Sequence, residues 1–263
     1  MDTSEASSSS PTHDEILSLL VHRTYDPNIV VQLEQYLSCQ LQNTQPYVLD
    51  ANRTLLKLYQ FFPHLRKDGD GVVSNILFLS LLQFPDSAEH IGSLRCLIPE
   101  RVQSKEPCAT IVRCAELLDN CQLAEFWTTY HTLPSVISET ASAESLTVSN
   151  NLLIEAASSP ITLHQLRTSI LALLSYTYRV APLSVLLTSL DLASADAVGE
   201  FLKTLEKEEK GEVCFERMEN DGSVVFKPTE QNTARTEIYE KSIGFGDVAS
   251  VLGSGLGGKL FSQ

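Results

Sequence analysis

The sequence predicts a mainly α-helical protein in which stacked helical hairpins, of the HEAT-like kind, precede a winged-helix module with a small β-hairpin. From about residue 13 to residue 205, apolar residues recur at helical spacing in segments joined by short turns. Over residues 212–227 they alternate instead, around the turn signal Asp221-Gly222. A lone hairpin is marginal in water and must pack on helices, so two helices followed by this hairpin predict a winged helix.

The 263 residues divide into four expected parts. A Ser-rich first segment is expected to be disordered because it has too few apolar residues to form a core. A helical-repeat domain and a winged-helix domain follow, and further helices with a Gly-rich tail close the chain. The expected boundaries are 1–12, 13–158, 159–232 and 233–263.

Recognisable caps mark the first helices. Thr12 and Glu15 can form a capping box. Asp26 precedes Pro27, and proline suits the first position of a helix. Pro63 ends the third helix because proline cannot continue one. In this half we expect helices at about 13–22, 27–41, 48–62, 72–83, 86–98, 107–120 and 122–131.

The second half contains one segment of different composition. Residues 133–159 are rich in Ser, Thr and Ala, and we expect a loop that holds one helix near 146–157. Ser159-Pro160 then opens a long helix to about Val180. Further helices are expected at about 182–190, 194–205, 230–241 and 243–252. The expected buried stripe of the long helix is Leu163, Leu166, Ile170, Leu173, Leu174 and Tyr178.

The turn sets the expected register of the hairpin. A two-residue loop at 221–222 places Glu216 opposite Lys227 and Arg217 opposite Phe226. Strand alternation then gathers apolar side chains on one face, which can pack on the helices. These side chains are Val213, Phe215, Val224 and Phe226.

Charge argues against binding of nucleic acid. The chain has 33 acidic and 19 basic residues, a formal net charge of −14. The helix at 194–205, which would occupy the groove-reading position, offers Lys203 against Asp196 and Glu200. A phosphate backbone is bound through Lys and Arg, so we expect no strong direct binding of nucleic acid.

Motifs of enzymes and metal sites are missing from the sequence. There is no P-loop, H-E-x-x-H or G-x-S-x-G, and the six histidines and six cysteines show no ligand spacing. A G-x-G-x-x-G that begins at Gly253 lacks the helix that a dinucleotide site needs. We therefore expect no enzyme, with no catalytic, cofactor-binding or metal-binding residues, and no cofactor. The cysteines are expected to be reduced, buried thiols, and Trp127 to belong to the packed core.

The sequence predicts a cytoplasmic protein that makes no membrane contact. Its first residues lack the apolar core of a signal peptide. The longest mostly apolar run, 72–84, is too short to span a bilayer.

This order of elements resembles the PCI family, which supplies subunits of the proteasome lid, the signalosome and a translation initiation complex. Within it, short motifs resemble the family of subunit k of eukaryotic translation initiation factor three. The motifs lie at residues 25–27 (YDP), 33–36 (LEQY), 49–52 (LDAN), 56–61 (LKLYQF) with Pro63, 116–119 (ELLD) and 243–251.

The resemblance implies a noncatalytic scaffold subunit of the initiation complex. Its implied partners are other PCI subunits, especially subunit l, and the small ribosomal subunit only indirectly. PCI subunits contribute closing helices to a shared bundle, and by resemblance the contact residues here are Phe245, Val248, Val251 and Leu252. The alternatives are a small PCI subunit of the proteasome lid or signalosome, an RNA-binding winged helix, or an enzyme whose site is assembled from distant residues.

Overall fold

The fold is mainly helical with one small antiparallel sheet. The computed structural model describes residues 11–66, 70–144, 148–208 and 214–233. Its elements in chain order are α1 (His13–His22), η1 (Pro27–Ile29), α2 (Val30–Leu41), α3 (Leu49–Phe61), η2 (Pro63–Leu65), α4 (Gly71–Leu81), α5 (Ser87–Arg95), α6 (Glu100–Gln103), α7 (Cys108–Asp119), α8 (Leu123–Glu144), α9 (Val148–Ser158), α10 (Pro160–Thr177), β1 (Val180–Ala181), α11 (Leu183–Leu190), α12 (Ala195–Glu208), β2 (Phe215–Met218) and β3 (Val224–Phe226).

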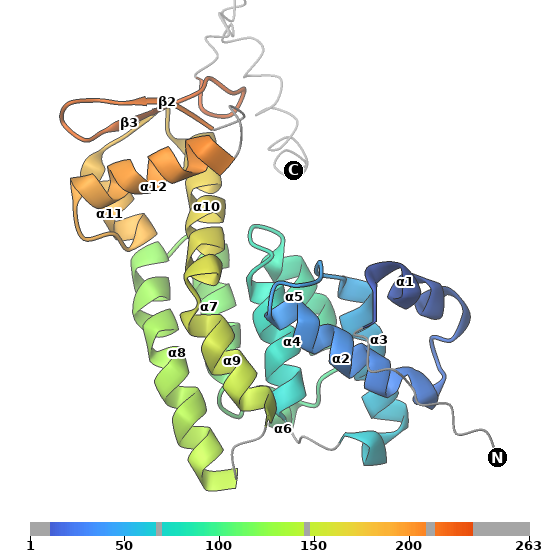
Figure 1. The fold of residues 1–263 in the computed structure, drawn as a ribbon. Helices are drawn as coiled ribbons and strands as arrows, with labels where there is room; N and C mark the ends of the chain where they lie inside the picture. Colours follow the sequence, from blue (N-terminus) through green and yellow to red (C-terminus); the bar gives the residue numbers. More distant parts are fainter. Residues whose placement is uncertain (1–10, 67–69, 145–147, 209–213, 234–263) are drawn as a thin grey trace, which may run out of the picture.

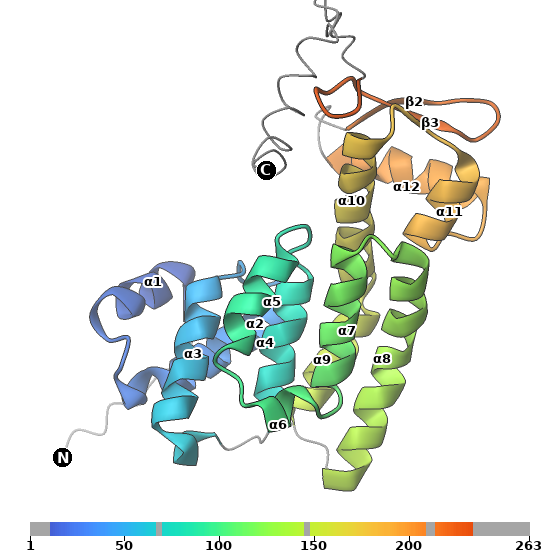
Figure 2. The same cartoon turned by 180° about the vertical axis from the view of Figure 1, so that it is seen from behind.

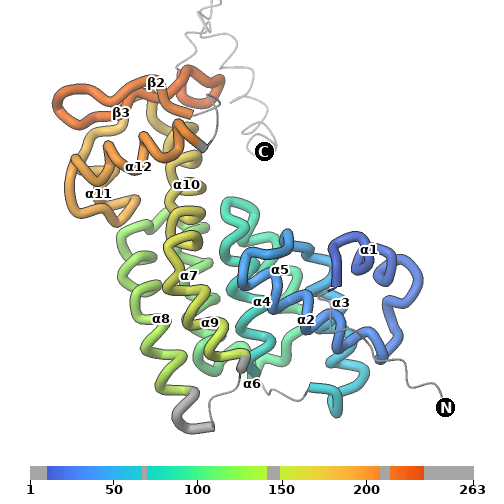
Figure 3. The backbone as a smooth tube through the Cα atoms, in the orientation of Figure 1, coloured from blue at the N-terminus to red at the C-terminus, as the bar shows by residue number. Residues whose placement is uncertain are grey.

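These elements form a helical body with the sheet at one end. Helices α1–α5 make one side of the molecule, and helices α7–α10 make a column beside them (Figure 1). The sheet lies across the top of the column, with α11 and α12 beneath it. Figure 2 shows the opposite side, where α7 lies alongside α8. The chain passes from the α1–α5 side through the column to the sheet (Figure 3).

Local capping explains where several helices begin. The Thr12 hydroxyl accepts a hydrogen bond from the Glu15 backbone N–H, and the Glu15 carboxylate accepts one from the Thr12 N–H, which confirms the capping box. Asp26 accepts from the backbone N–H of Asn28, although the first turn that follows is a 3-10 helix. Ser159 likewise caps α10, as predicted.

Helix α4 is the centre of the packed body. Every residue from Gly71 to Leu81 is buried, and the helix packs against α2, α5, α7 and α9. A helix that is apolar all round must be enclosed, because no face of it suits water. Several polar side chains in this core have hydrogen-bond partners, although Asn75 Oδ1 on α4 has none among the described residues. Tyr130, for example, donates from its hydroxyl to the Ala157 carbonyl at 2.9 Å.

The prediction of a loop over residues 133–159 is wrong in the first half of that range. Helix α8 continues to Glu144 with Pro134 inside it, and α9 follows as a second helix over Val148–Ser158. Leu133 and Ile137 are fully buried on α8. This burial stabilises the helix despite a composition that favours loops, because most helical stability in proteins comes from packing of an apolar face.

The sheet contains a strand that the sequence did not reveal. Its order is β1-β3-β2, all antiparallel, so β3 is the central strand. The long helix therefore ends at Thr177 rather than near Val180. Tyr178, predicted in the buried stripe, is instead the extended C-cap residue and is 36% exposed.

The predicted register of the hairpin is also wrong. Phe215 pairs with Phe226, Arg217 with Val225, and a bulge separates the two pairs. Gly222 donates its N–H to the Glu219 carbonyl and has φ +82°. These features describe a turn of three residues closed by a left-handed glycine, not a two-residue turn. The apolar face was predicted correctly where it is described, because Phe215, Val224 and Phe226 are buried, whereas Val213 lies outside the described residues.

Candidate interaction surface

Buried contacts fix the sheet end to the helical column. Trp127 on α8 is 2% exposed and donates from Nε1 to the Ser189 carbonyl on α11 at 2.7 Å. Arg167 on α10 donates from Nε to the Leu190 carbonyl at 2.8 Å and from Nη2 to the Asp191 carbonyl at 3.1 Å. Its guanidinium carbon lies 5.6 Å from the centre of the Trp127 ring. Trp127 is therefore core, as predicted, and it joins the two parts of the fold.

The buried thiols and phenols are structural. Burial raises the pKa of the Cys108 thiol from 9.0 to about 11 and that of Cys114 to about 12. Burial also raises the pKa of Tyr130. The expectation of buried thiols is wrong for Cys96 and Cys121, which are exposed. Reactive cysteines need a lowered pKa, so the thiols in the core are not suited to nucleophilic chemistry.

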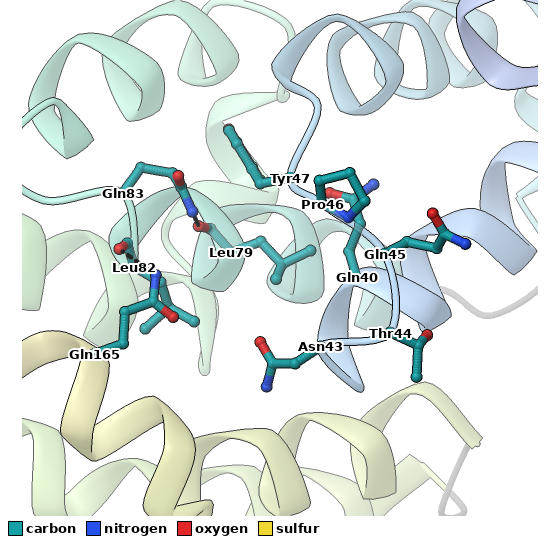
Figure 4. Close-up of a pocket in the computed structure, with 10 residues that line it drawn as sticks. All are labelled: Gln40, Asn43, Thr44, Gln45, Pro46, Tyr47, Leu79, Leu82, Gln83 and Gln165. Carbon is teal, nitrogen blue, oxygen red and sulfur yellow. Dashed lines mark hydrogen bonds between the residues drawn. The ribbon is translucent and has the colours of Figure 1, made fainter. Parts of the chain in front are cut away.

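A hollow of about 350 Å³ lies between the α2–α3 loop, the end of α4 and α10. Figure 4 shows Asn43 and Gln165 extending toward each other across it. Gln165 donates from Nε2 to the Leu82 carbonyl at 3.2 Å, and Tyr47 shares a hydrogen bond with Ser80. Its lining is made of neutral amides, hydroxyls and apolar side chains, without the acid, base or nucleophile of a catalytic site.

The described residues contain neither a metal-binding cluster nor a membrane-spanning helix. No three His, Cys, Asp or Glu side chains converge there as a metal site requires. In the same part of the chain, no helix combines the length and the hydropathy needed to cross a membrane.

The outer surface of the sheet end is acidic. On α12, the exposed charged side chains include Asp196, Glu200 and Lys203, as the sequence predicted. On the hairpin, Glu216 forms an ion pair with Arg179 at 3.2 Å. This pairing leaves Arg179 less available to a phosphate group, since its charge is already matched.

Exposed apolar side chains gather in two places. One group lies on α1 and at the end of α3, where the rings of Tyr25 and Phe61 meet edge to face at 5.8 Å. The other follows the end of α10 into β1 and comprises Tyr176, Tyr178 and Val180, which are 52%, 36% and 48% exposed. Sequence reasoning missed the second group, because the helical spacing assigned Tyr178 to the buried stripe.

The contact residues implied by resemblance are not placed by the structure. Phe245, Val248, Val251 and Leu252 all lie outside the described residues, as do the expected helices at 243–252 and most of 230–241. The described chain stops at Thr233, beside the end of α10.

Comparisons with known proteins give one repeated answer. The chain is 26% identical to eukaryotic translation initiation factor 3 subunit K of Aspergillus niger over 243 aligned positions, covering 84% of this chain and 79% of that protein. It is also 26% identical to the Aspergillus terreus subunit K, with 88% of each chain covered. The Dictyostelium discoideum subunit K is 35% identical over 115 residues, 43% of this chain and 44% of that relative. In each of these comparisons the chain is similar to a subunit K protein.

This result confirms the resemblance drawn from the short motifs. No family model matches the chain, so the similarity to subunit K proteins rests on these pairwise comparisons. The stretch that is 35% identical covers less than half of the Dictyostelium protein, whereas the Aspergillus alignments run along most of both chains. The names of these relatives are those of an initiation factor subunit and not of an enzyme, in agreement with the noncatalytic chain that the sequence predicts.

Proposed function

We propose that this protein is a noncatalytic scaffold subunit of the eukaryotic translation initiation factor 3 complex and acts in the cytoplasm. The observation that supports this proposal most directly is the alignment with two subunit K proteins along 84% and 88% of the chain. In this proposal it binds other PCI subunits, subunit l in particular, and reaches the small ribosomal subunit only through them. Its contacts include the C-terminal residues Phe245, Val248, Val251 and Leu252.

We further propose that the sheet end is a winged-helix module of the PCI kind. The order α10-β1-α11-α12-β2-β3 supports this proposal, because three helices packed under a small antiparallel sheet are the parts of such a module. In this division, residues 13–158 form the helical-repeat domain and residues 159–232 the winged-helix domain. The buried joint between Trp127 and Ser189 would hold the two domains as one scaffold.

Affinity purification from cell extract tests the assignment. We expect the tagged full chain to recover initiation factor subunits, subunit l among them. Recovery of proteasome lid or signalosome subunits without any initiation factor subunit would refute it.

A paired variant tests the C-terminal contacts. Phe245→Asp with Val248→Asp should abolish recovery of subunit l, because two charges replace apolar contacts. Ser250→Asp with Ser254→Asp adds the same charges without removing apolar side chains and should retain the partner. Equal recovery by both double variants would show that these residues make no contact.

Direct binding of RNA is the alternative function, and the acidic surface argues against it. We expect the isolated chain to bind single-stranded RNA too weakly to measure at low salt, because a phosphate backbone needs clustered Lys and Arg. Tight binding that weakens steeply with rising salt would instead support a nucleic-acid role.

A further inference from the structure

The exposed side chains of Tyr176, Tyr178 and Val180 lie beside an unpaired strand edge. Val180 stands opposite Val225, and Phe226 donates its N–H to the Arg179 carbonyl at 3.0 Å. Hydrogen-bonded and non-hydrogen-bonded pairs alternate in antiparallel strands, so Val180 and Val225 form a non-hydrogen-bonded pair. The backbone N–H and C=O of Val180 therefore point away from β3. Within the described residues, no strand covers that edge.

This surface is both apolar and able to form hydrogen bonds. Tyr176 and Val180 are about half exposed. Tyr178 and Val180 are two residues apart in an extended segment, so their side chains lie on the same side of it. Exposed strand edges with apolar side chains are sites of protein association unless something covers them. Pro182 follows β1 and, without an N–H group, limits the free edge to a few residues.

The end of the described chain is held against the end of α10, next in sequence to Tyr176. Asn232 donates from Nδ2 to the Ser175 carbonyl at 2.8 Å and to the Lys227 carbonyl at 2.8 Å. Thr229 and Asn232 also bond to each other, which closes a small turn over the end of α10. The chain therefore leaves Thr233 next to Ser175, the residue that precedes Tyr176.

The apolar segment 243–252 begins within reach of the surface. Nine residues lie between Thr233 and Ile243, so ten Cα-to-Cα steps join them. A stretch of this length can span up to about 35 Å. A tether so short gives the attached segment an effective concentration on the order of millimolar. The segment carries Ile243, Phe245, Val248 and Leu252, which can replace water on the exposed rings.

We propose that segment 243–252 docks within the same chain on the surface formed by Tyr176, Tyr178 and the outer edge of β1. The segment shields the strand edge when no other subunit is bound. Together with the proposed function, the docking means that a partner which binds Phe245 and Val248 must first displace the segment. The free chain then binds this partner more weakly than the intrinsic contacts allow, because only the undocked fraction is competent.

Hydrogen exchange on the full chain tests the docking. The readout is the exchange rate of the Val180 amide, followed by mass spectrometry with overlapping peptides. Phe245→Asp with Val248→Asp should accelerate this exchange at least fivefold. The control, Ser250→Asp with Ser254→Asp, should leave it unchanged. In the reverse direction, Tyr176→Ser with Tyr178→Ser should accelerate exchange over residues 243–252, with an unchanged circular dichroism spectrum.

Each outcome decides the proposal. Equal Val180 exchange in the wild type and in both double variants overturns it. Protection that falls as the protein is diluted also overturns it, because the contact would then join two copies. Protection that is independent of concentration and lost only in the apolar variant supports it. Recovery of subunit l is scored separately, so loss of the partner without a change in exchange would refute the docking and leave the proposed function standing.

Discussion

Trp127 on α8 and Ser189 on α11 are joined by a hydrogen bond of 2.7 Å from the indole Nε1 to the backbone carbonyl, across 62 residues of sequence. The bond is buried, and the guanidinium group of Arg167 lies over the same indole ring. Arg167 also donates to two carbonyls at the end of α11. One tryptophan and one arginine therefore fix the sheet end to the helical column.

Replacement of Trp127 by phenylalanine tests this joint. The variant keeps an aromatic ring but leaves the buried Ser189 carbonyl without its donor. We expect the free energy of unfolding to fall by about 1–3 kcal/mol. Urea unfolding followed by far-UV circular dichroism measures the change. As a control, Phe61→Leu alters a ring that is 61% exposed and should change stability by less than about 0.5 kcal/mol. Equal midpoints for the two variants would contradict a stabilising role for the joint.

Replacement of Arg167 by lysine should destabilise the fold. The guanidinium group donates from Nε and Nη2 to separate carbonyls, a geometry that a single ammonium group cannot reproduce. We expect Arg167→Lys to lower the free energy of unfolding by about 1–2 kcal/mol. Arg217→Lys makes the same exchange at a side chain that is 66% exposed and pairs with Glu219 on the surface. Its effect should stay within about 0.5 kcal/mol, and a similar loss at both sites would argue against specific capping of α11 by Arg167.

Two glycine-to-alanine variants test the left-handed conformation of the hairpin turn. Gly222 has φ +82°, and a Cβ there would lie 2.8 Å from Leu183 Cδ2. Gly222→Ala should therefore cost about 1–3 kcal/mol of stability. Gly92 lies in α5 with no atom within 4 Å of an added Cβ, so Gly92→Ala should stabilise by about 0.5–1 kcal/mol. Thermal unfolding of both variants measures these opposite changes, and a harmless Gly222→Ala would refute the left-handed turn.

Local signals predicted the helix starts, and long-range contacts account for the errors. The bonds of Thr12 and Ser159 span two or three residues, so the sequence alone shows them. Strand β1 has two residues and exists only because β3, more than 40 residues later, pairs with it. Leu133 and Ile137 hold α8 together through burial, which composition does not report. Propensity is a weak prior that such tertiary contacts override.

The candidate surface shows the same division between local and long-range information. Resemblance assigned contacts to residues 243–252, which the structure does not describe. Tyr178 was predicted to be buried because helical spacing includes it, yet the helix ends one residue earlier. Its exposure follows from the turn into β1, and the position of that turn depends on β3. The exposed edge could therefore be recognised only once the sheet was known.

The buried thiols should make stability depend on pH in the alkaline range. Burial raises the pKa of Cys108 to about 11 and of Cys114 to about 12, so the folded chain holds these protons where the unfolded chain, with a pKa near 9.0, releases them. Stability from these groups is therefore complete below pH 9 and falls as the pH rises toward 11, by at most about 1.4 kcal/mol per pH unit for each thiol. Urea midpoints between pH 8 and pH 11 measure this slope.

Paired alanine variants separate the thiols from other titrating groups. Tyr130, whose pKa burial also raises, adds to the slope at the upper end of the range. Cys108→Ala with Cys114→Ala should flatten the slope between pH 9 and pH 11 without abolishing it. Cys96→Ala with Cys121→Ala removes exposed thiols and should leave it unchanged. If the two double variants lose stability with pH as steeply as each other, buried thiols do not govern the alkaline loss.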